Sequence, residues 1–302
     1  MCFMRILHLL NWPLKDISYC LDKISSQGFN AIQINPIQPL KENGYREWWM
    51  SYQPCGFRIG NIYGNKKELL ALCQQAENYD LKIIADVICN HTAESIHGNL
   101  EPHPLVDEEL RSNPNFWKEK VNISDWDNRF QVINYCMGLP GLQTANHELQ
   151  DMIIDFLNDL IDCGVMGFRF DAAKSIALPN EGNDFWPRVL DGLNKYGLFL
   201  YGEVLFANTQ LIDDYANYIN VLTNYSGSDV TRLVKYVENH DTFLSEGNLG
   251  YTKNISSESI AEQYHYLTSF YPNTLFYARP YDKTWESGII HDANCAQLQR
   301  VK

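Results

Sequence analysis

Hydrophobic and polar residues alternate along the first part of the chain in strand-like and helical patterns. In the helical segments apolar residues recur every three or four positions, whereas the strand-like segments are short apolar runs. The strand-like runs are 5–12, 30–37 and 81–91, and the helical segments are 14–28 and 66–80. Strands separated by helices favour parallel pairing with right-handed crossovers.

The same alternation returns after residue 146. Helical patterns lie at 147–164, 183–197, 209–219 and 259–270, and strand-like runs at 165–172, 198–205, 220–225, 232–241 and 273–279. Strands and helices repeated about eight times predict a (β/α)8 TIM barrel in the α/β class. The competing fold is an open doubly wound sheet, but no Gly-rich phosphate loop follows the first strand.

Two segments depart from a regular barrel. Residues 92–146 are rich in His, Pro, Asn and Asp, and they are too long for a simple connection. We therefore predict a subdomain at 92–146, inserted into a barrel formed by 1–91 and 147–302. Only about "SGSDVT" links the sixth and seventh strands, whereas a crossover with its helix needs about 10–12 residues. We expect helix 6 to be deleted and a sheet edge to be exposed there.

Composition narrows the choice of partner. The formal net charge of −13 disfavours nucleic acid, because phosphate binding needs clustered Lys and Arg. No apolar run reaches membrane-spanning length. The eighteen Tyr, fourteen Phe and seven Trp serve mainly as core, although sugar rings also stack on aromatic side chains. The eight Cys show no C-x-x-C spacing, so we expect reduced structural thiols.

Polar residues cluster where four predicted strands end. The clusters are "DVICNH" with Asp86, Asn90 and His91, "GFRFDAAK" with Arg169, Asp171 and Lys174, "GEV" with Glu203, and "VENHD" with Glu238, Asn239, His240 and Asp241. A single cluster of this kind would be explained by a strand that runs out into solvent. A single acid would be explained by an ion pair at the mouth of the barrel. Since the active-site groups of a barrel lie at the carboxyl ends of its strands, four clusters on one rim indicate a catalytic site.

Three acids on one rim suggest glycoside hydrolysis with retention, in which a nucleophilic carboxylate and a carboxylic acid lie about 5–5.5 Å apart. Arg169 lies two residues before Asp171 on the same strand face and would keep it ionised. Apolar neighbours in "LYGEVLF" would raise the pKa of Glu203, as a general acid requires. Asp241 would hold sugar hydroxyls and help to distort the ring.

Over nearly its whole length the chain resembles α-amylases of the large α-amylase family of glycoside hydrolases. The four strand-end motifs occur in the family's order, "EWWMSYQPCGFRIGN" (47–61) resembles the loop after strand 2, and "FWP" (185–187) recurs in bacterial members. The resemblance implies that Asp171 is the nucleophile, Glu203 the acid/base and Asp241 the transition-state stabiliser. It implies further sugar contacts from His91, Arg169, His240, Tyr52, Gln53 and Lys174, and a cleft lined by Trp48 and Trp49, unless these two pack under the loop.

The resemblance also implies a structural calcium between barrel and insertion, but its ligands are incomplete. Asn90 matches one ligand. The motif "LPDLN", whose aspartate is another, is here "LPGLQT" (139–144) with Gly141 in the ligand position. Ser175 replaces a histidine that normally offers its backbone carbonyl. Because calcium depends on charged oxygen ligands, we expect its site to be weakened or lost.

We expect an endo-acting, retaining α-1,4-glucan hydrolase that acts on starch or glycogen as a monomer, without an organic cofactor. The alternatives are an oligosaccharide-acting α-glucosidase or glucanotransferase, and a truncated, non-catalytic glucan-binding protein. The last is favoured by the short link and by the end of the chain at Lys302, where "HDANCAQLQRVK" remains for helix 8 and no β-sandwich follows. The N-terminus lacks a signal-peptide pattern, which predicts a cytoplasmic protein, or a secreted one if an upstream leader is missing.

Overall fold

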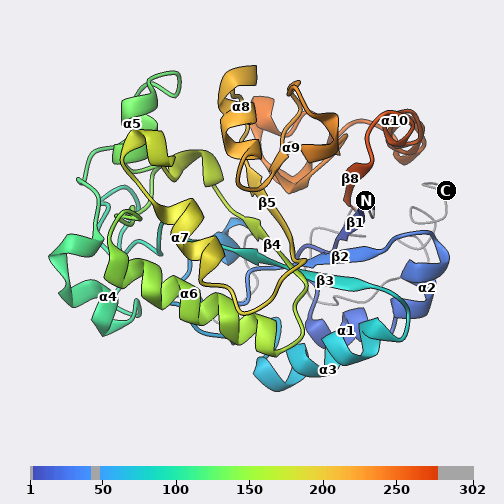
Figure 1. Cartoon of the computed structure of the whole chain (residues 1–302), viewed down its shortest axis with the longest axis horizontal. Helices are drawn as coiled ribbons and strands as arrows, with labels where there is room; N and C mark the ends of the chain where they lie inside the picture. The colour runs from blue at the N-terminus through green and yellow to red at the C-terminus, as the bar shows by residue number, and fades with distance from the viewer. Residues whose placement is uncertain (1–2, 42–47, 278–302) are drawn as a thin grey trace.

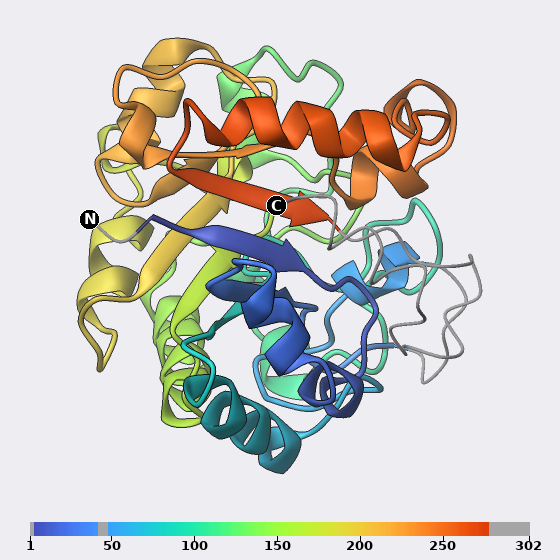
Figure 2. The same ribbon diagram turned by 90° about the vertical axis from the view of Figure 1, so that its right-hand side faces the viewer.

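The computed structural model describes residues 3–41 and 48–277. Within them eight parallel strands close into a barrel in chain order, as the alternation predicted (Figure 1). The strands are β1 (Arg5–His8), β2 (Ala31–Ile34), β3 (Lys82–Val87), β4 (Gly167–Phe170), β5 (Phe199–Glu203), β6 (Asn220–Leu222), β7 (Leu233–Tyr236) and β8 (Asn273–Tyr277). Strand β8 lies beside β1 in Figure 2, in a register that pairs Ile6 with Leu275 and closes the ring.

Helices cover the outside of the barrel. They are α1 (Leu14–Ser18), α2 (Leu21–Ser26), α3 (Lys66–Glu77), α6 (His147–Asp162), α7 (Phe185–Asp191), α8 (Thr209–Ala216) and α10 (Ser257–Thr268). In α6, the Asn146 side chain caps the helix by accepting from the Leu149 amide, and Ile153, Phe156 and Leu160 are buried along one face. The continuous helix predicted at 14–28 is wrong, because the chain leaves helical geometry at Cys20 (φ −123°).

Side chains alternate between two apolar layers along each strand. Ile6 and Ile84 belong to the cluster inside the barrel, whereas their neighbours Leu7 and Ile83 belong to the layer between strands and helices. This is the period of two that extended chains impose. Asp86 follows Ile84 by two positions, so the interior changes from apolar to charged at the carboxyl ends of the strands.

The sixth crossover has lost its helix, as predicted. Only the 3₁₀ turn η5 (Val230–Arg232) lies between β6 and β7. The expected exposed sheet edge is wrong, since Val221 pairs with Leu233 and Leu222 with Val234. Two contacts hold the short link: Arg232 donates through Nε to the carbonyl of Ala216 at 2.9 Å, and Lys235 donates through Nζ to the carbonyl of Tyr225 at 2.8 Å.

The segment between β3 and α6 lies to one side of the barrel in Figure 1. It contains α4 (Glu108–Ser112), η2 (Pro114–Phe116) and α5 (Arg129–Asn134) and adds no strand to the barrel. Isolated bridges join His91 to Gly141 and Trp117 to Leu142, which brings the end of this segment back to the rim. Its predicted boundaries, 92 and 146, stay a prediction.

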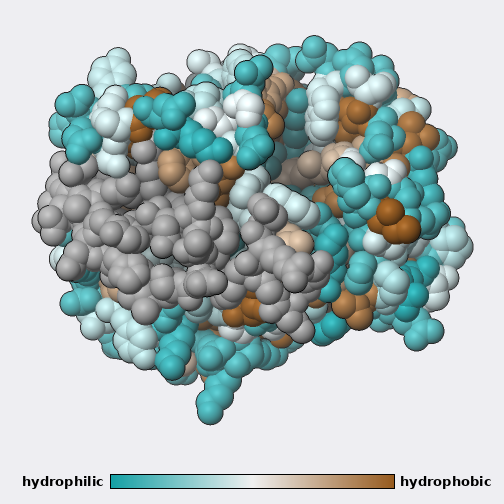
Figure 3. All heavy atoms as spheres, turned by 180° about the vertical axis from the view of Figure 1, so that it is seen from behind, coloured by the Kyte–Doolittle hydropathy of each residue, from teal (hydrophilic) through white to brown (hydrophobic). Residues whose placement is uncertain are grey.

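On the face seen in Figure 3, the coloured atoms are mostly hydrophilic, with scattered hydrophobic patches. Among residues 3–41 and 48–277, no helix has the length and hydropathy needed to cross a bilayer. The six cysteines in these ranges are all free thiols. The helix predicted at 291–302 lies outside the described residues.

Candidate active site

A single arginine binds three acidic side chains where the strands end. Nη1 of Arg169 donates to both carboxylate oxygens of Asp86, at 2.9 and 3.1 Å, and to Oδ1 of Asp171 at 2.6 Å. Its Nη2 forms an ion pair with Oε1 of Glu203 at 2.7 Å. The arginine side chain is 1% exposed, so its charge acts on these acids with little screening by water.

Strand register explains this convergence. Asp86 of β3 is paired directly with Arg169 of β4. Asp171 lies two residues after Arg169, on the same side of the extended chain, and its amide continues the ladder by donating to the carbonyl of Val87 at 2.9 Å. Glu203 is the last residue of β5, the next strand around the barrel.

The residue after Asp171 has an unusual backbone conformation. Ala172 has φ 48° and ψ 34°, in the left-handed region, which costs a residue with a Cβ about 1–2 kcal/mol. This turn aims the Ala172 amide at Oε2 of Glu203, at 3.3 Å. The strained turn thus couples the backbone beside Asp171 to the position of Glu203.

Burial changes the protonation of these acids. It raises the pKa of Glu203 to about 7, and the neighbouring Asp171 and Asp241 act in the same direction against the attraction of Arg169. Burial likewise raises the pKa of Asp86 and of Asp241. One guanidinium cannot offset the desolvation of several carboxylates. Glu203 therefore exchanges a proton near neutral pH, as a general acid/base must.

His240 and Asp241 lie in a helix rather than in a strand. The strand predicted at 232–241 ends at Tyr236, and Asn239 caps α9 (His240–Leu244) by accepting from the Thr242 amide. The His240 ring stacks on Tyr52 with centroids 5.0 Å apart and planes 6° apart, and its Nε2 lies 3.7 Å from Oδ1 of Asp241. Burial lowers the pKa of His240 to about 3, so the ring is neutral.

Tyr52 links both histidines to the charged cluster. It ends η1 (Trp48–Tyr52), and its hydroxyl donates to Oδ2 of Asp86 at 3.0 Å. Its carbonyl lies 3.0 Å from Nε2 of His91, and the same nitrogen lies 4.0 Å from Oδ2 of Asp171. Burial lowers the pKa of His91.

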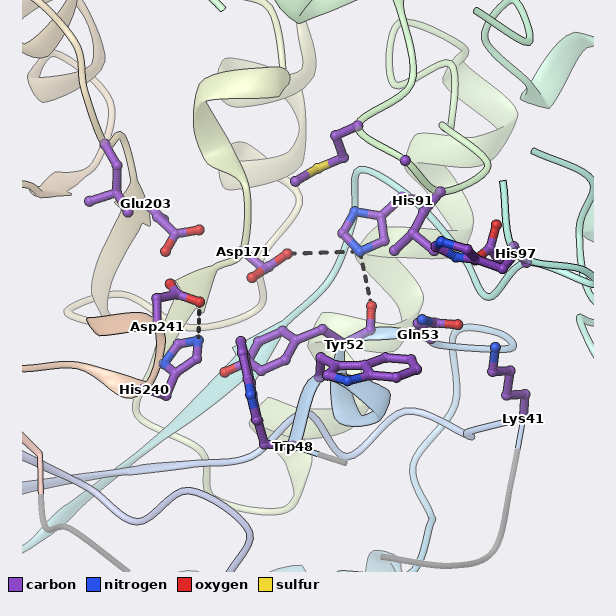
Figure 4. Close-up of a pocket in the computed structure, with 16 residues that line it drawn as sticks. Lys41, Trp48, Tyr52, Gln53, His91, His97, Asp171, Glu203, His240 and Asp241 are labelled. Carbon is purple, nitrogen blue, oxygen red and sulfur yellow. Dashed lines mark hydrogen bonds and ion pairs between the residues drawn. The ribbon is translucent and has the colours of Figure 1, made fainter. Parts of the chain in front are cut away.

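These side chains line a cleft of about 710 Å³ (Figure 4). Of the residues predicted from sequence, its walls include Trp48, Trp49, Tyr52, Gln53, His91, Asp171, Glu203, His240 and Asp241. Arg169 does not line the cleft but lies buried beneath it. Lys174 lines an adjoining pocket of about 460 Å³ with Trp126 and Phe206. The two pockets share Met137, Glu203 and Leu205, so the acid lies between them.

Sequence reasoning missed the cleft residues that come from loops. They are Lys41, Glu94, His97, Met137, Gly138, Leu139 and Leu205 in the larger pocket, with Trp126 and Phe206 in the smaller one. None of them belongs to a strand-end motif. The available signal was the long polar segment 92–146, which contributes Glu94, His97, Trp126 and 137–139.

The position that the resemblance assigns to calcium does not suit a metal. Oδ1 of Asn90 and the carbonyl of Ser175 both accept from Nζ of Lys118, at 2.9 and 3.1 Å. Gly141 offers no side-chain oxygen. In the part of the chain that the structure describes, no three His, Cys, Asp or Glu side chains gather as a metal site. Burial lowers the pKa of Lys118 to about 8, which leaves it mostly protonated at pH 7.

Comparison with known proteins points to one family. The family model "Alpha amylase, catalytic domain" matches residues 13–218. An α-amylase of Clostridium acetobutylicum is 33% identical over 270 residues, which covers 79% of this chain and 35% of the relative. One of Butyrivibrio fibrisolvens is 26% identical over 347 residues, which covers 93% and 35%. The chain thus spans about a third of the length of these curated relatives.

Solved structures of similar fold include two α-amylases. The enzyme of Geobacillus thermoleovorans, complexed with acarbose, superposes with a TM-score of 0.74 at 19% identity, covering 99% of this chain and 77% of that one. α-Amylase I of Eisenia fetida gives a TM-score of 0.76 at 18% identity, covering 95% and 68%. At these identities the likeness concerns the fold.

Proposed function

The chain belongs to the α-amylase family of glycoside hydrolases, and from this premise we propose that it is an endo-acting, retaining α-1,4-glucan hydrolase acting on starch or glycogen. The observation that carries the proposal is the contact of one guanidinium, that of Arg169, with both Asp171 and Glu203. This contact holds the two carboxyl groups close together in one cleft, and a retaining mechanism requires such a closely spaced pair.

In the first step Asp171 attacks the anomeric carbon. Arg169 binds its Oδ1, whereas Oδ2 accepts no hydrogen bond from the described residues and is the oxygen that forms the glycosyl ester. Glu203, protonated near neutral pH, gives its proton to the glycosidic oxygen as the bond from the anomeric carbon to that oxygen breaks. The leaving chain departs as a neutral alcohol.

In the second step Glu203 acts as a base. Its carboxylate takes a proton from a water molecule, whose oxygen attacks the anomeric carbon and releases Asp171 as a carboxylate. Two inversions leave the configuration unchanged. The same carboxyl group acts first as an acid and then as a base, for which a pKa near neutrality is well matched.

Other cleft residues bind the sugar. Among the described residues, Oε1 of Gln53, Nδ1 of His91 and Nδ1 of His240 are buried without a hydrogen-bond partner. Such groups are costly to leave unpaired, and since these atoms are closed to solvent, sugar hydroxyls would pair with them only after the side chains shift on binding. Asp241 accepts from hydroxyls of the distorted ring, and Tyr52 provides an apolar platform beside it.

The arrangement of the pockets supports attack within a polysaccharide. Trp48 and Trp49 lie in the pocket on one side of Glu203, and Trp126 and Phe206 in the pocket on the other. A glucan that crosses both pockets would present an internal bond to Asp171 and Glu203. This geometry supports endo cleavage.

The test is the release of reducing ends from soluble starch by the purified chain. Asp171→Asn abolishes release if Asp171 is the nucleophile, whereas Asp155→Asn, on the exposed face of α6, leaves it unchanged. Starch breakdown that survives in Asp171→Asn, or a β-configured first product by NMR, refutes the retaining mechanism. A covalent fluoroglycosyl adduct on the peptide containing Asp171 would identify the nucleophile directly.

The alternatives make different products from the same site. A glucanotransferase is favoured by the pocket around Lys174, which offers room for an acceptor sugar, and it would yield lengthened or cyclic glucans with few new reducing ends. The short β6–β7 link favours the non-catalytic alternative, but the closure of the barrel across that link weakens it.

A further inference from the structure

Lys118 lies where the inserted segment meets two strand ends of the barrel. Asn90 follows β3, and Ser175 ends η3 (Ala173–Ser175), which follows β4. Nζ of Lys118 donates to Oδ1 of Asn90 at 2.9 Å and to the carbonyl of Ser175 at 3.1 Å. One ammonium group therefore bridges the insertion and both strand ends.

The two oxygens that bind this ammonium are the two that the family resemblance assigns to calcium. The third expected ligand is the side chain at position 141, which is absent in Gly141. Lys118 is 5% exposed, and a buried cation must be paired or hydrogen-bonded to be tolerated. Its partners here are an amide oxygen and a backbone carbonyl.

A side chain at position 141 would crowd the stem of Lys118. A Cβ at 141 would lie 2.9 Å from Cδ of Lys118, 3.3 Å from its Cβ and 3.3 Å from Sγ of Cys136. Lys118 is also fixed at its backbone, because its amide donates to the carbonyl of Gly141 at 2.9 Å. An aspartate at 141 thus requires displacement of the lysine stem, whereas glycine leaves the stem where it lies.

From this geometry we propose that the Lys118 ammonium replaces the structural calcium, so that the chain folds and keeps its insertion in place without the metal. A divalent ion at the same oxygens would face a fixed positive charge in a poorly screened environment. The residues that the ammonium binds are close in sequence to cleft residues. Asn90 precedes His91, and Ser175 lies four residues after Asp171. The proposal concerns folding and does not depend on the proposed activity.

The first test uses the unaltered chain. Its thermal midpoint should agree within about 1 °C in EDTA and in millimolar CaCl2, since a ligand that does not bind the folded state cannot stabilise it. A midpoint that falls in EDTA and recovers with calcium, or one calcium per purified chain by elemental analysis, overturns the proposal. Neither readout requires catalysis, so failure of the starch assay leaves this result interpretable.

The second test removes the charge and keeps most of the stem. Lys118→Met should lower the midpoint by about 5 °C or more, with faster hydrogen exchange at 86–92 and 171–176. Lys120→Met is the matched control, because Lys120 is half exposed and pairs with Glu101 at the surface; it should shift the midpoint by less than about 2 °C. Equal midpoints for Lys118→Met and the unaltered chain overturn the proposal. If Lys118→Met does not fold, the calcium test alone decides.

Discussion

Arg169 binds Asp171 at 2.6 Å through the same Nη1 that contacts Asp86. A guanidinium is planar and carries several donors in fixed directions, so one side chain reaches acids in or just after three different strands. An ammonium is a point charge and cannot reproduce this set. The relationship makes Arg169 a positioning residue for Asp171, the proposed nucleophile, and for Glu203.

Arg169→Lys should therefore lower kcat/KM on starch by at least about 100-fold. It should also reduce the free energy of unfolding by about 3–5 kcal/mol, because it leaves buried carboxylates without their partner. Arg188→Lys is the control, since Arg188 pairs with Asp151 at the surface, and it should change stability by less than about 1 kcal/mol. Steady-state kinetics and denaturant unfolding measure both effects. Similar losses in the two variants would contradict the assigned role.

The pH dependence of kcat/KM should have an alkaline limb set by Glu203. The proposed mechanism needs this group protonated to donate to the leaving oxygen, and burial raises its pKa to about 7. Activity should therefore fall as pH rises through that value. In Glu203→Gln the limb should disappear together with activity on starch, while glycosyl fluorides, whose leaving group needs little protonation, retain measurable turnover. An alkaline limb that persists with fluorides in Glu203→Gln would assign it to another group.

Glu203→Gln should also stabilise the fold at alkaline pH. A raised pKa means that the folded state holds the proton more tightly than the unfolded state does. The resulting stability is complete below the unfolded value of about 4.3 and is lost as pH rises through about 7. The variant, always neutral at this position, should gain on the order of 2 kcal/mol over the unaltered chain between pH 5 and pH 8. A thermal shift that is the same at both pH values would contradict the raised pKa.

Tyr52 should act through its ring more than through its hydroxyl. Tyr52→Phe keeps the stacking on His240 and loses only the hydrogen bond to Asp86, so kcat/KM should fall by about tenfold or less. Tyr52→Ala removes the platform and the support of His240, and should cost at least about 100-fold. Steady-state kinetics on starch measure kcat/KM for both variants. If both lose activity equally, the hydroxyl rather than the ring is what matters.

The sequence predicted those site residues that lie at the ends of successive strands. Asp86, Arg169, Asp171 and Glu203 converge because parallel strands end at one rim and side chains alternate with a period of two. Asp241 was found by its motif, although it lies in α9 rather than in a strand. A five-residue helix contains too little periodic pattern to be distinguished from the end of a strand.

No pattern in the sequence predicted the contacts of Lys118. The residue lies in an aperiodic segment, and its partners are an amide oxygen and a backbone carbonyl 57 residues away in the chain. Contacts of this kind depend on how the insertion folds back on the barrel, which local patterns do not encode. The sequence identifies Gly141 only as a missing ligand, although its lack of a side chain also leaves room for the stem of Lys118.

The short link between β6 and β7 has a consequence for folding kinetics. Val221 and Leu233 pair across a sequence separation of twelve residues (233 − 221), whereas Ile6 and Leu275 pair across 269 (275 − 6). The entropy lost on closing a loop grows with the logarithm of its length, and pairings between distant residues form slowly. We therefore expect β6 and β7 to meet early, as a nucleus onto which their neighbours add, and the β1–β8 seam to close last.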